Sequence, residues 1–400
     1  MDGFTSTPFW MDTLCVPVAP ERQNYRNLAI RAMASTYKRA SIVLVLDGEL
    51  LLCNKDASML ELYTRIKLSG WMRRLWTLQE GMLAYDTFFQ FNNGARSLIQ
   101  IVTNLREEIV SLGLDLFTRF DQDASSTFFP LLQNHRTFQA RSRDPRISTS
   151  GIAFSLNNIW RALQWRSTSH RGDETVCLAT LLGLDPGPLL QISSQDHTAR
   201  MIQLLKMIPE IPLSVLFQPP PYLHIKGFRW APPSFLASFR GAEALPAQRH
   251  ATVANLDSSK EALLVTLPGL LINIEGIPED YTSVSGFVIR LADYPLRFFD
   301  VQYIVKPTEC SHGFDITAQA EPAVILAEPI IKGGKSREIF GAVVFISGWA
   351  PEMKMLEASF YRMCILNAVE TEERLERLRR RENWWREAAT VPGDWVWRVT

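Results

Sequence analysis

Apolar residues near the N-terminus fall into short runs with two different spacings. Ile30, Met33, Tyr37 and Ala40 recur every three or four positions, which predicts a helix over Glu21–Arg39 with one buried stripe. Ile42–Leu46 is a run of branched apolar residues that ends at the turn pair Asp47-Gly48, so we expect a strand there.

Phe9–Val16 is also mostly apolar and lies between two prolines, which predicts a short strand buried on both faces of a parallel sheet. Asp12 interrupts this run, and a carboxylate there requires hydrogen bonds or a crevice at the end of the strand. Leu60–Ala84 is predicted to be helical with a break at Ser69-Gly70, and Thr87–Phe91 to be a strand.

The turn signal Asn92-Asn93-Gly94 ends the last of these strands. Strands that alternate with helices at these lengths predict βαβ units and a parallel sheet. Ligands of such sheets bind beyond the carboxyl ends of the strands. Cys15–Arg22 and the start of the Trp71–Glu80 helix are expected to lie at that edge.

The middle of the chain is predicted to be helical. Its expected helices are Ser97–Phe120, Phe154–Arg166 and Glu174–Leu182, with Asp173 as the N-cap of the third. Residues 121–150 are rich in Asp, Ser, Gln and Arg, which is typical of a surface loop.

From about Gly227 the pattern changes to short β-type runs separated by Gly and Pro, which predicts a small antiparallel sheet or barrel-like accessory region. These runs are Ala262–Leu267, Leu270–Glu275, Gly286–Leu291, Val324–Ala327 and Ile339–Ile346. Lys332–Ser336 imitates the end of a phosphate-binding loop, but Pro329 stands where its first glycine belongs, so we expect a hairpin turn.

Pro351–Ala389 carries Glu and Arg interleaved at helical spacing and is predicted to form a long C-terminal helix with tryptophans beside it. The expected organisation is therefore an α/β domain over residues 1–96, a helical region over 97–210 and a mostly β region over 211–350. A C-terminal helix with a Trp-rich tail follows over residues 351–400.

Composition narrows the classes of function. Of 400 residues, 46% are hydrophobic, and 42 basic residues balance 42 acidic ones, so charge gives no reason to expect nucleic acid or an anionic membrane as a partner. The five cysteines are scattered without CxxC spacing, which favours free thiols in a reducing, intracellular compartment. Cys310-Ser311-His312 lacks further metal ligands, so no metal is expected. Neither a signal peptide nor a transmembrane segment is expected.

Three segments occur in the order found in the fungal heterokaryon incompatibility (HET) domain, which this chain resembles. They are Phe9-Trp10-Met11-Asp12-Thr13-Leu14-Cys15, the Met33-x-x-x-Tyr37-x-x-Ala40 stripe and Arg74-Leu75-Trp76-Thr77-Leu78-Gln79-Glu80. The match covers about the first quarter of the chain. Weaker similarity continues through Arg166–Ser169, Asp173-Glu174, Leu181–Asp185 and Gly227–Pro232.

The resemblance implies a fold related to TIR domains and a role in fungal self/non-self recognition and programmed cell death. In enzymatic TIR domains the corresponding glutamate lies where NAD⁺ loses nicotinamide, so Glu80 is the catalytic candidate. Asp12, Cys15, Arg74 and Trp76 are the substrate-binding candidates. A carboxylate suits that reaction, because it stabilises an oxocarbenium-like state.

Several alternatives stay open at this point. Glu80, Arg74 and Asp12 are also typical of ordinary surface or hydrogen-bonding positions, and Trp71 and Trp76 of core positions. The family's opening Ser-Tyr-x-Trp-Gly-type strand has no counterpart before Phe9, so we expect an incomplete sheet with one open edge, as in a truncated product.

The first hypothesis is therefore a signalling or interaction module that acts through protein partners or self-association, without a cofactor. The second is an NAD⁺ glycohydrolase that uses Glu80, with NAD⁺ as substrate. The third is a degenerate paralogue without activity.

Overall fold

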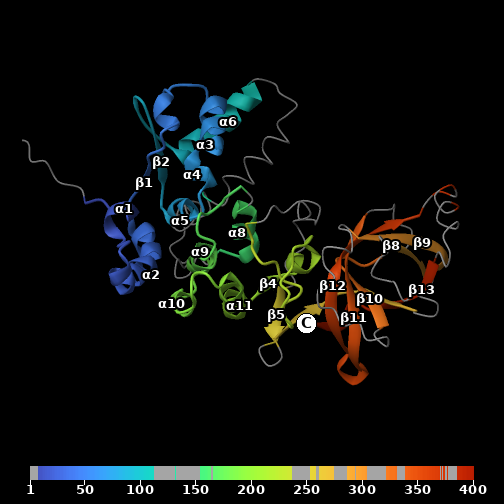
Figure 1. Cartoon of the computed structure of the whole chain (residues 1–400). Coiled ribbons are helices and arrows are strands. Elements are labelled where there is room, and N and C mark those ends of the chain that lie inside the picture. The colour runs from blue at the N-terminus through green and yellow to red at the C-terminus, as the bar shows by residue number, and fades with distance from the viewer. Residues whose placement is uncertain are drawn as a thin grey trace, which may run out of the picture. The chain divides into compact units, whose positions relative to one another are not determined.

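The structure is a computed structural model of the chain. It describes residues 8–111, 131, 154–163, 165–236, 253–257, 261–273, 286–292, 294–303, 321–330, 338–369, 371, 373, 376 and 385–400. The chain divides into two compact units, Met1–Leu204 and Leu205–Thr400 (Figure 1). It contains both helices and a large mixed β-sheet, so the α/β class is confirmed.

Unit 1 combines helices with a three-stranded sheet of order β1-β2-β3. Its strands are β1 (Val43–Val45), β2 (Thr87–Phe91) and β3 (Gly94–Ser97). Its helices up to residue 111 are α1 (Asp12–Cys15), η1 (Pro20–Arg22), α2 (Gln23–Arg39), η2 (Leu50–Leu52), α3 (Met59–Leu68), α4 (Gly70–Arg73), α5 (Thr77–Leu83) and α6 (Leu98–Ser111). The later ones are α8 (Leu156–Leu163), α9 (Asp173–Leu181), α10 (Gly187–Leu190) and α11 (His197–Met207), the last of which crosses the unit boundary.

The parallel pairing expected for the N-terminal module is present. β1 pairs in parallel with β2, with Leu44 opposite Phe88, because helices α3 to α5 form the crossover between the two strands. β2 then turns into β3 as an antiparallel hairpin. Gly94 has a φ of +138°, a conformation that favours glycine, so the Asn92-Asn93-Gly94 prediction is confirmed.

The break expected at Ser69-Gly70 is also confirmed. Ser69 ends α3 and caps α4, because its hydroxyl accepts a hydrogen bond from the Met72 N–H at 3.3 Å and donates one to the Ile66 carbonyl at 2.7 Å.

The buried strand predicted over Phe9–Val16 is wrong. Residues Asp12–Cys15 form the short helix α1, none of whose residues is buried, and Phe9 is 78% exposed. The Asp12 carboxylate accepts a 2.7 Å hydrogen bond from the Thr13 N–H. A polar residue that satisfies the backbone locally favours a turn of helix over a strand.

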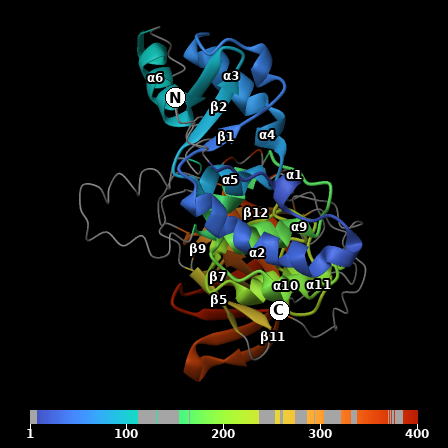
Figure 2. The ribbon, with the colours of Figure 1, turned by 90° about the vertical axis from the view of Figure 1, so that its left-hand side faces the viewer.

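The core of unit 1 is built around α9, which is buried along its whole length from Glu174 to Leu181. α9 lies beside α5 and α2 (Figures 1 and 2). Asp173 is its first residue and Gly172 stands at the N-cap without a side-chain cap, so the prediction that Asp173 caps this helix is wrong.

Unit 2 is dominated by an eleven-stranded mixed sheet. Its elements are β4 (Ile211–Pro212), η3 (Leu213–Phe217), β5 (Val253–Asp257), β6 (Ala262–Thr266), β7 (Gly269–Ile272), β8 (Gly286–Leu291), β9 (Tyr294–Tyr303), β10 (Glu321–Leu326), β11 (Ile339–Ala350), η6 (Pro351–Met353), β12 (Met355–Ala368), β13 (Trp385–Val391) and β14 (Val396–Val399).

Seven of these strands close into a ring, in the order β11-β10-β7-β13-β8-β9-β12 and back to β11 (Figure 1). Each predicted run contains a strand among its described residues, but the sheet is mixed rather than antiparallel, since β12 pairs in parallel with β14 and β13 with β8. Buried apolar side chains from several of these strands, including Leu270, Ile289 and Val343, form one hydrophobic core.

The long helix predicted over Pro351–Ala389 is wrong. Its described parts are mainly β12 and β13, with the short η6 at Pro351–Met353, and only Glu373 and Glu376 among the described residues are α-helical. Leu356, Ala358 and Phe360 are buried, whereas the residues between them are partly exposed, which is the two-residue period of a strand. Trp397 in β14 is fully buried, and its indole donates to the Leu267 carbonyl at 2.8 Å.

In the described part of the chain, no helix combines the length and apolar character needed to cross a membrane.

Candidate functional site

The Trp71–Glu80 block is held in place by two contacts from outside it. The Asp47 carboxylate, just after β1, accepts a 3.0 Å hydrogen bond from the Trp71 N–H. Leu75 donates its N–H to the Ser167 carbonyl at 2.9 Å, and Arg74 forms a parallel bridge with Ser167. α5 therefore starts from a backbone fixed by residues far away in the sequence.

Glu80 lies in the first turn of α5 and is partly buried. Its Oε2 accepts a 2.9 Å hydrogen bond from the indole Nε1 of Trp71, which is buried. Burial raises the pKa of Glu80 above its ordinary value of 4.5, and the Asp12 carboxylate raises it further. The Trp71 hydrogen bond and the guanidinium groups of Arg74 and Arg166 act in the opposite direction.

Tyr37 on α2 belongs to the same cluster. Its side chain is 6% exposed, and its ring meets that of Trp10 edge-on at 5.3 Å between centroids. Burial raises the pKa of the Tyr37 hydroxyl, and the negative charges of Glu80 and Asp12 add to that effect. Tyr37 is therefore a neutral hydroxyl beside two carboxyl groups.

Arg166 is hydrogen-bonded to the Trp71–Thr77 turn that carries part of the cluster. It is 4% exposed, and its Nη1 donates to the Arg74 carbonyl at 2.7 Å and to Thr77 Oγ1 at 2.8 Å. Its guanidinium carbon lies 5.7 Å from the centre of the Trp71 ring. Burial lowers the pKa of Arg166 to about 10, so the group stays charged at neutral pH.

We call these residues the Glu80 cluster: Asp12, Tyr37, Trp71, Arg74, Glu80 and Arg166. The cluster combines a carboxyl that holds its proton more readily than a free glutamate with a neutral phenol and two guanidinium groups. Groups of these kinds can hydrogen-bond the hydroxyls of a polar ligand, and an ionised carboxylate can stabilise a developing positive charge. It brings together three of the residues singled out in the sequence, namely Asp12, Arg74 and Glu80.

Two other residues singled out in the sequence lie elsewhere. Cys15 is at the exposed end of α1, and the contacts of the described residues do not join it to Glu80. Trp76 donates its indole N–H to the Asp173 carboxylate at 2.8 Å, which ties the start of α5 to α9. Trp76 thus acts as a packing residue on α9.

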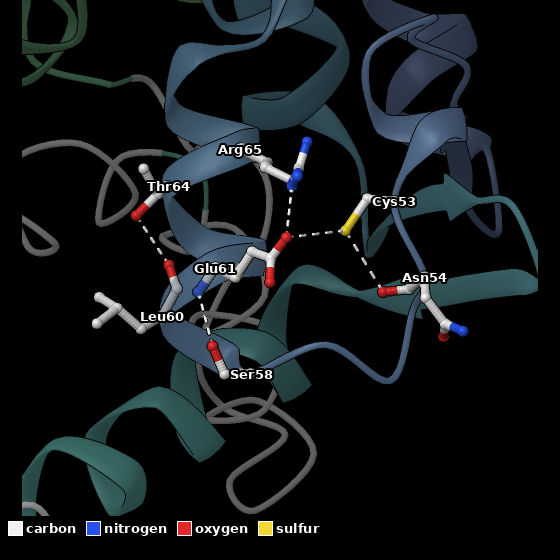
Figure 3. A network of polar contacts seen from close by, with 7 residues as sticks. All are labelled: Cys53, Asn54, Ser58, Leu60, Glu61, Thr64 and Arg65. Atoms are coloured by element: carbon white, nitrogen blue, oxygen red, sulfur yellow. Dashed lines mark hydrogen bonds and ion pairs between the residues drawn. The ribbon is translucent and has the colours of Figure 1, made fainter.

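A second polar network surrounds Cys53 (Figure 3). Ser58 caps α3 by accepting from the Glu61 N–H at 3.2 Å, and Glu61 binds Arg65 at 2.9 Å. The Cys53 thiol lies 3.9 Å from the same Glu61 carboxylate and is 4% exposed. Burial raises the pKa of Cys53, so this thiol stays protonated and serves as packing at the start of α3.

The remaining motifs form no site among the described residues. Cys15, Cys53, Cys177 and Cys364 are free cysteines there, and no group of three or more His, Cys, Asp or Glu side chains could hold a metal ion. Trp230 of the Gly227–Pro232 segment is fully buried and donates to the Gly227 carbonyl at 2.8 Å, which makes a structural turn. Lys332–Ser336 and Cys310–His312 lie outside the described residues.

No protein-family model, curated protein or solved structure matches this chain. The Glu80 cluster is therefore interpreted from its own contacts and from the motifs in the sequence.

Sequence reasoning missed the role of Arg166 and the direct contact between Trp71 and Glu80. Arg166 is 92 positions from Arg74, whose carbonyl it binds. Local sequence patterns do not predict a contact between residues that are so far apart in the chain. The one available signal was the Arg166–Ser169 segment, which belongs to the weaker part of the HET resemblance.

Proposed function

We propose that this chain is a HET-type protein of fungal self/non-self recognition and programmed cell death, with a TIR-like N-terminal module that acts by protein interaction. The observation that carries the proposal is the convergence of three separate motif segments. Trp10 and Asp12 from the first, Tyr37 from the second and Glu80 from the third lie in mutual ring or electrostatic contact. A resemblance in motif order is stronger support for a shared function when the motif residues also lie together in space.

A role in interaction, rather than in chemistry, is supported by the surface of unit 1. Most of the exposed large apolar side chains of the described residues belong to this unit, among them Leu14, Val18, Tyr25, Leu44 and Leu46. Where such side chains lie together in a contiguous patch, they mark a site of association. Glu80, in turn, already uses one oxygen to bind Trp71, as expected of a residue that anchors the fold.

A second candidate function is NAD⁺ glycohydrolysis. It is favoured by the raised pKa of Glu80 and by the proximity of Asp12, Tyr37 and Arg74, because perturbed groups gather at catalytic sites. In this case Glu80 would bind ribose hydroxyls and stabilise the oxocarbenium-like state. A third possibility is a degenerate paralogue, in which the same cluster only stabilises the fold.

One experiment distinguishes the interaction module, the NAD⁺ glycohydrolase and the degenerate paralogue. The full chain is expressed from an inducible promoter in a filamentous fungus, and viability and cellular NAD⁺ are followed. Glu80→Gln is compared with Glu107→Gln, which alters an exposed glutamate on α6.

The interaction proposal expects loss of viability at constant NAD⁺ in all three strains. A fall in NAD⁺ that Glu80→Gln alone abolishes would replace the proposal with the enzyme function. Full viability and constant NAD⁺, with the folded chain present, would contradict both and leave the degenerate paralogue.

A further inference from the structure

We propose that β1 is a pairing edge through which two copies of this chain associate, strand against strand and antiparallel. This inference names the partner for the interaction role proposed above and rests on it. β1 lies at the end of its sheet.

β1 pairs on one side only. Its parallel partner is β2, and among the described residues no strand pairs with its other edge. The Val43 N–H donates to the Asp86 carbonyl at 2.9 Å, so the backbone of Val43 faces β2. Because these groups alternate along a parallel strand, the N–H and C=O of Leu44 point to the open edge.

The strand at this open edge exposes apolar side chains on one face, and among the described residues no strand covers the edge. Ile42, Leu44 and Leu46 are 53%, 47% and 60% exposed, while Val45 between them is 2% exposed. Residues 41–46 contain no charged residue and no proline. Proteins commonly blunt a free edge with lysine, proline or a covering element, and an edge without these invites another strand.

The charges at the two ends of β1 favour a second copy in antiparallel orientation. Exposed Lys38 and Arg39 precede the strand, and exposed Glu49 follows it. A two-fold axis at Leu44 places the basic end of each copy beside the acidic end of the other, and it sets Ile42 opposite Leu46. A parallel pairing would bring like charges together, which is unfavourable.

The pairing has a simple hydrogen-bond pattern. With Leu44 opposite Leu44 of the second copy, these two residues exchange both of their backbone hydrogen bonds, as in any antiparallel narrow pair. The two three-stranded sheets then join into one continuous sheet. Because so few residues take part, the contact is small, and we expect dissociation constants of about 1 µM to 1 mM.

The test is sedimentation equilibrium of the full chain over a wide concentration range. Leu44→Pro removes the N–H that faces the open edge and spares the bonds to β2, and Leu44→Lys places two ammonium groups opposite each other. Leu28→Lys, on an exposed position of α2, is the matched control for added charge. Circular dichroism verifies that each variant is folded.

We expect the wild type and Leu28→Lys to dimerise with similar constants and both Leu44 variants to weaken the dimer at least about tenfold. A wild type that stays monomeric, or a dimer that the Leu44 variants leave intact, overturns the inference.

A charge exchange tests the orientation. Arg39→Glu is expected to weaken the dimer about threefold or more, and Arg39→Glu combined with Glu49→Arg to restore it. If the single and the double variant weaken the dimer equally, the antiparallel arrangement is ruled out. Loss of viability in the fungal assay with a monomeric chain would overturn this inference alone, since the interaction role could then use another partner.

Discussion

The indole Nε1 of Trp71 donates a 2.9 Å hydrogen bond to Oε2 of Glu80, which follows nine residues later at the other end of the Trp71–Glu80 block. Trp71 also meets Phe89 of β2 edge-on, with ring centroids 5.4 Å apart, and lies against the guanidinium of Arg166. The position of Glu80 thus depends on a ring that is itself packed between the sheet and a buried arginine.

Trp71→Phe keeps the ring in place but removes the donor. We expect the free energy of unfolding to fall by about 1–3 kcal/mol, because the partly buried carboxyl group of Glu80 loses its partner. The pKa of Glu80 should rise further, since the lost hydrogen bond favoured the charged form. Urea denaturation and NMR titration of the carboxyl carbon measure the two effects. Trp165→Phe, at a tryptophan that is 73% exposed, is the control.

The raised pKa of Glu80 makes its contribution to stability depend on pH. The folded chain binds the Glu80 proton more tightly than the unfolded chain, whose pKa is near 4.5, so protonation favours folding. That contribution is fully present below pH 4.5 and is lost as the pH rises through the folded pKa.

Glu80→Gln removes this dependence. The stability of the wild type relative to the variant should therefore fall over the range of pH above about 4.5, as measured by urea midpoints. A difference that stays constant across this range would contradict the raised pKa.

Arg166→Met removes the donor that holds the Trp71–Thr77 turn. Arg74 and Thr77 lose hydrogen bonds of 2.7 and 2.8 Å from a charged group, so we expect a loss of roughly 3–5 kcal/mol in the free energy of unfolding. Arg161→Met, at an exposed position of α8, should change stability by less than about 0.5 kcal/mol. Equal effects of the two substitutions would show that Arg166 does not organise the turn.

Gly269→Ala tests the packing of unit 2. A methyl group on Gly269 overlaps the ring of Trp397 and comes within 2.9 Å of the Val324 carbonyl oxygen, and the backbone of β10 does not yield easily. We expect a loss of roughly 3 kcal/mol in the free energy of unfolding. Gly393→Ala, whose nearest neighbour would be 3.6 Å away, should be close to neutral. Thermal denaturation of both variants measures the difference.

Local patterns predicted many of the elements correctly. The Ile30, Met33 and Tyr37 stripe forms the buried side of α2, and the run from Ile42 to Leu46 contains β1. These predictions succeed because a stripe of apolar side chains is stable only when the backbone period matches its spacing.

The same reasoning failed where two patterns competed. The interleaved charges suggested a helix that starts as early as Pro351, yet Leu356, Ala358 and Phe360 alternate in burial as a strand does, and strands β11 and β9 pair with β12. Burial between two strands outweighs the small stabilisation that charge pairs give to an exposed helix.

The sequence by itself determined the buried stripe and the C-terminal end of α2, the break at Ser69, the hairpin at Gly94 and the order of elements from α2 to β2. Only the tertiary structure decided which side chains surround Glu80, that the Trp76 indole donates a hydrogen bond to Asp173, and that α9 is buried in the core of unit 1. The reason is physical. Periodicity and capping act over a few residues, whereas the environment of a buried carboxyl is set by contacts such as that between Arg166 and Arg74, which join distant parts of the chain.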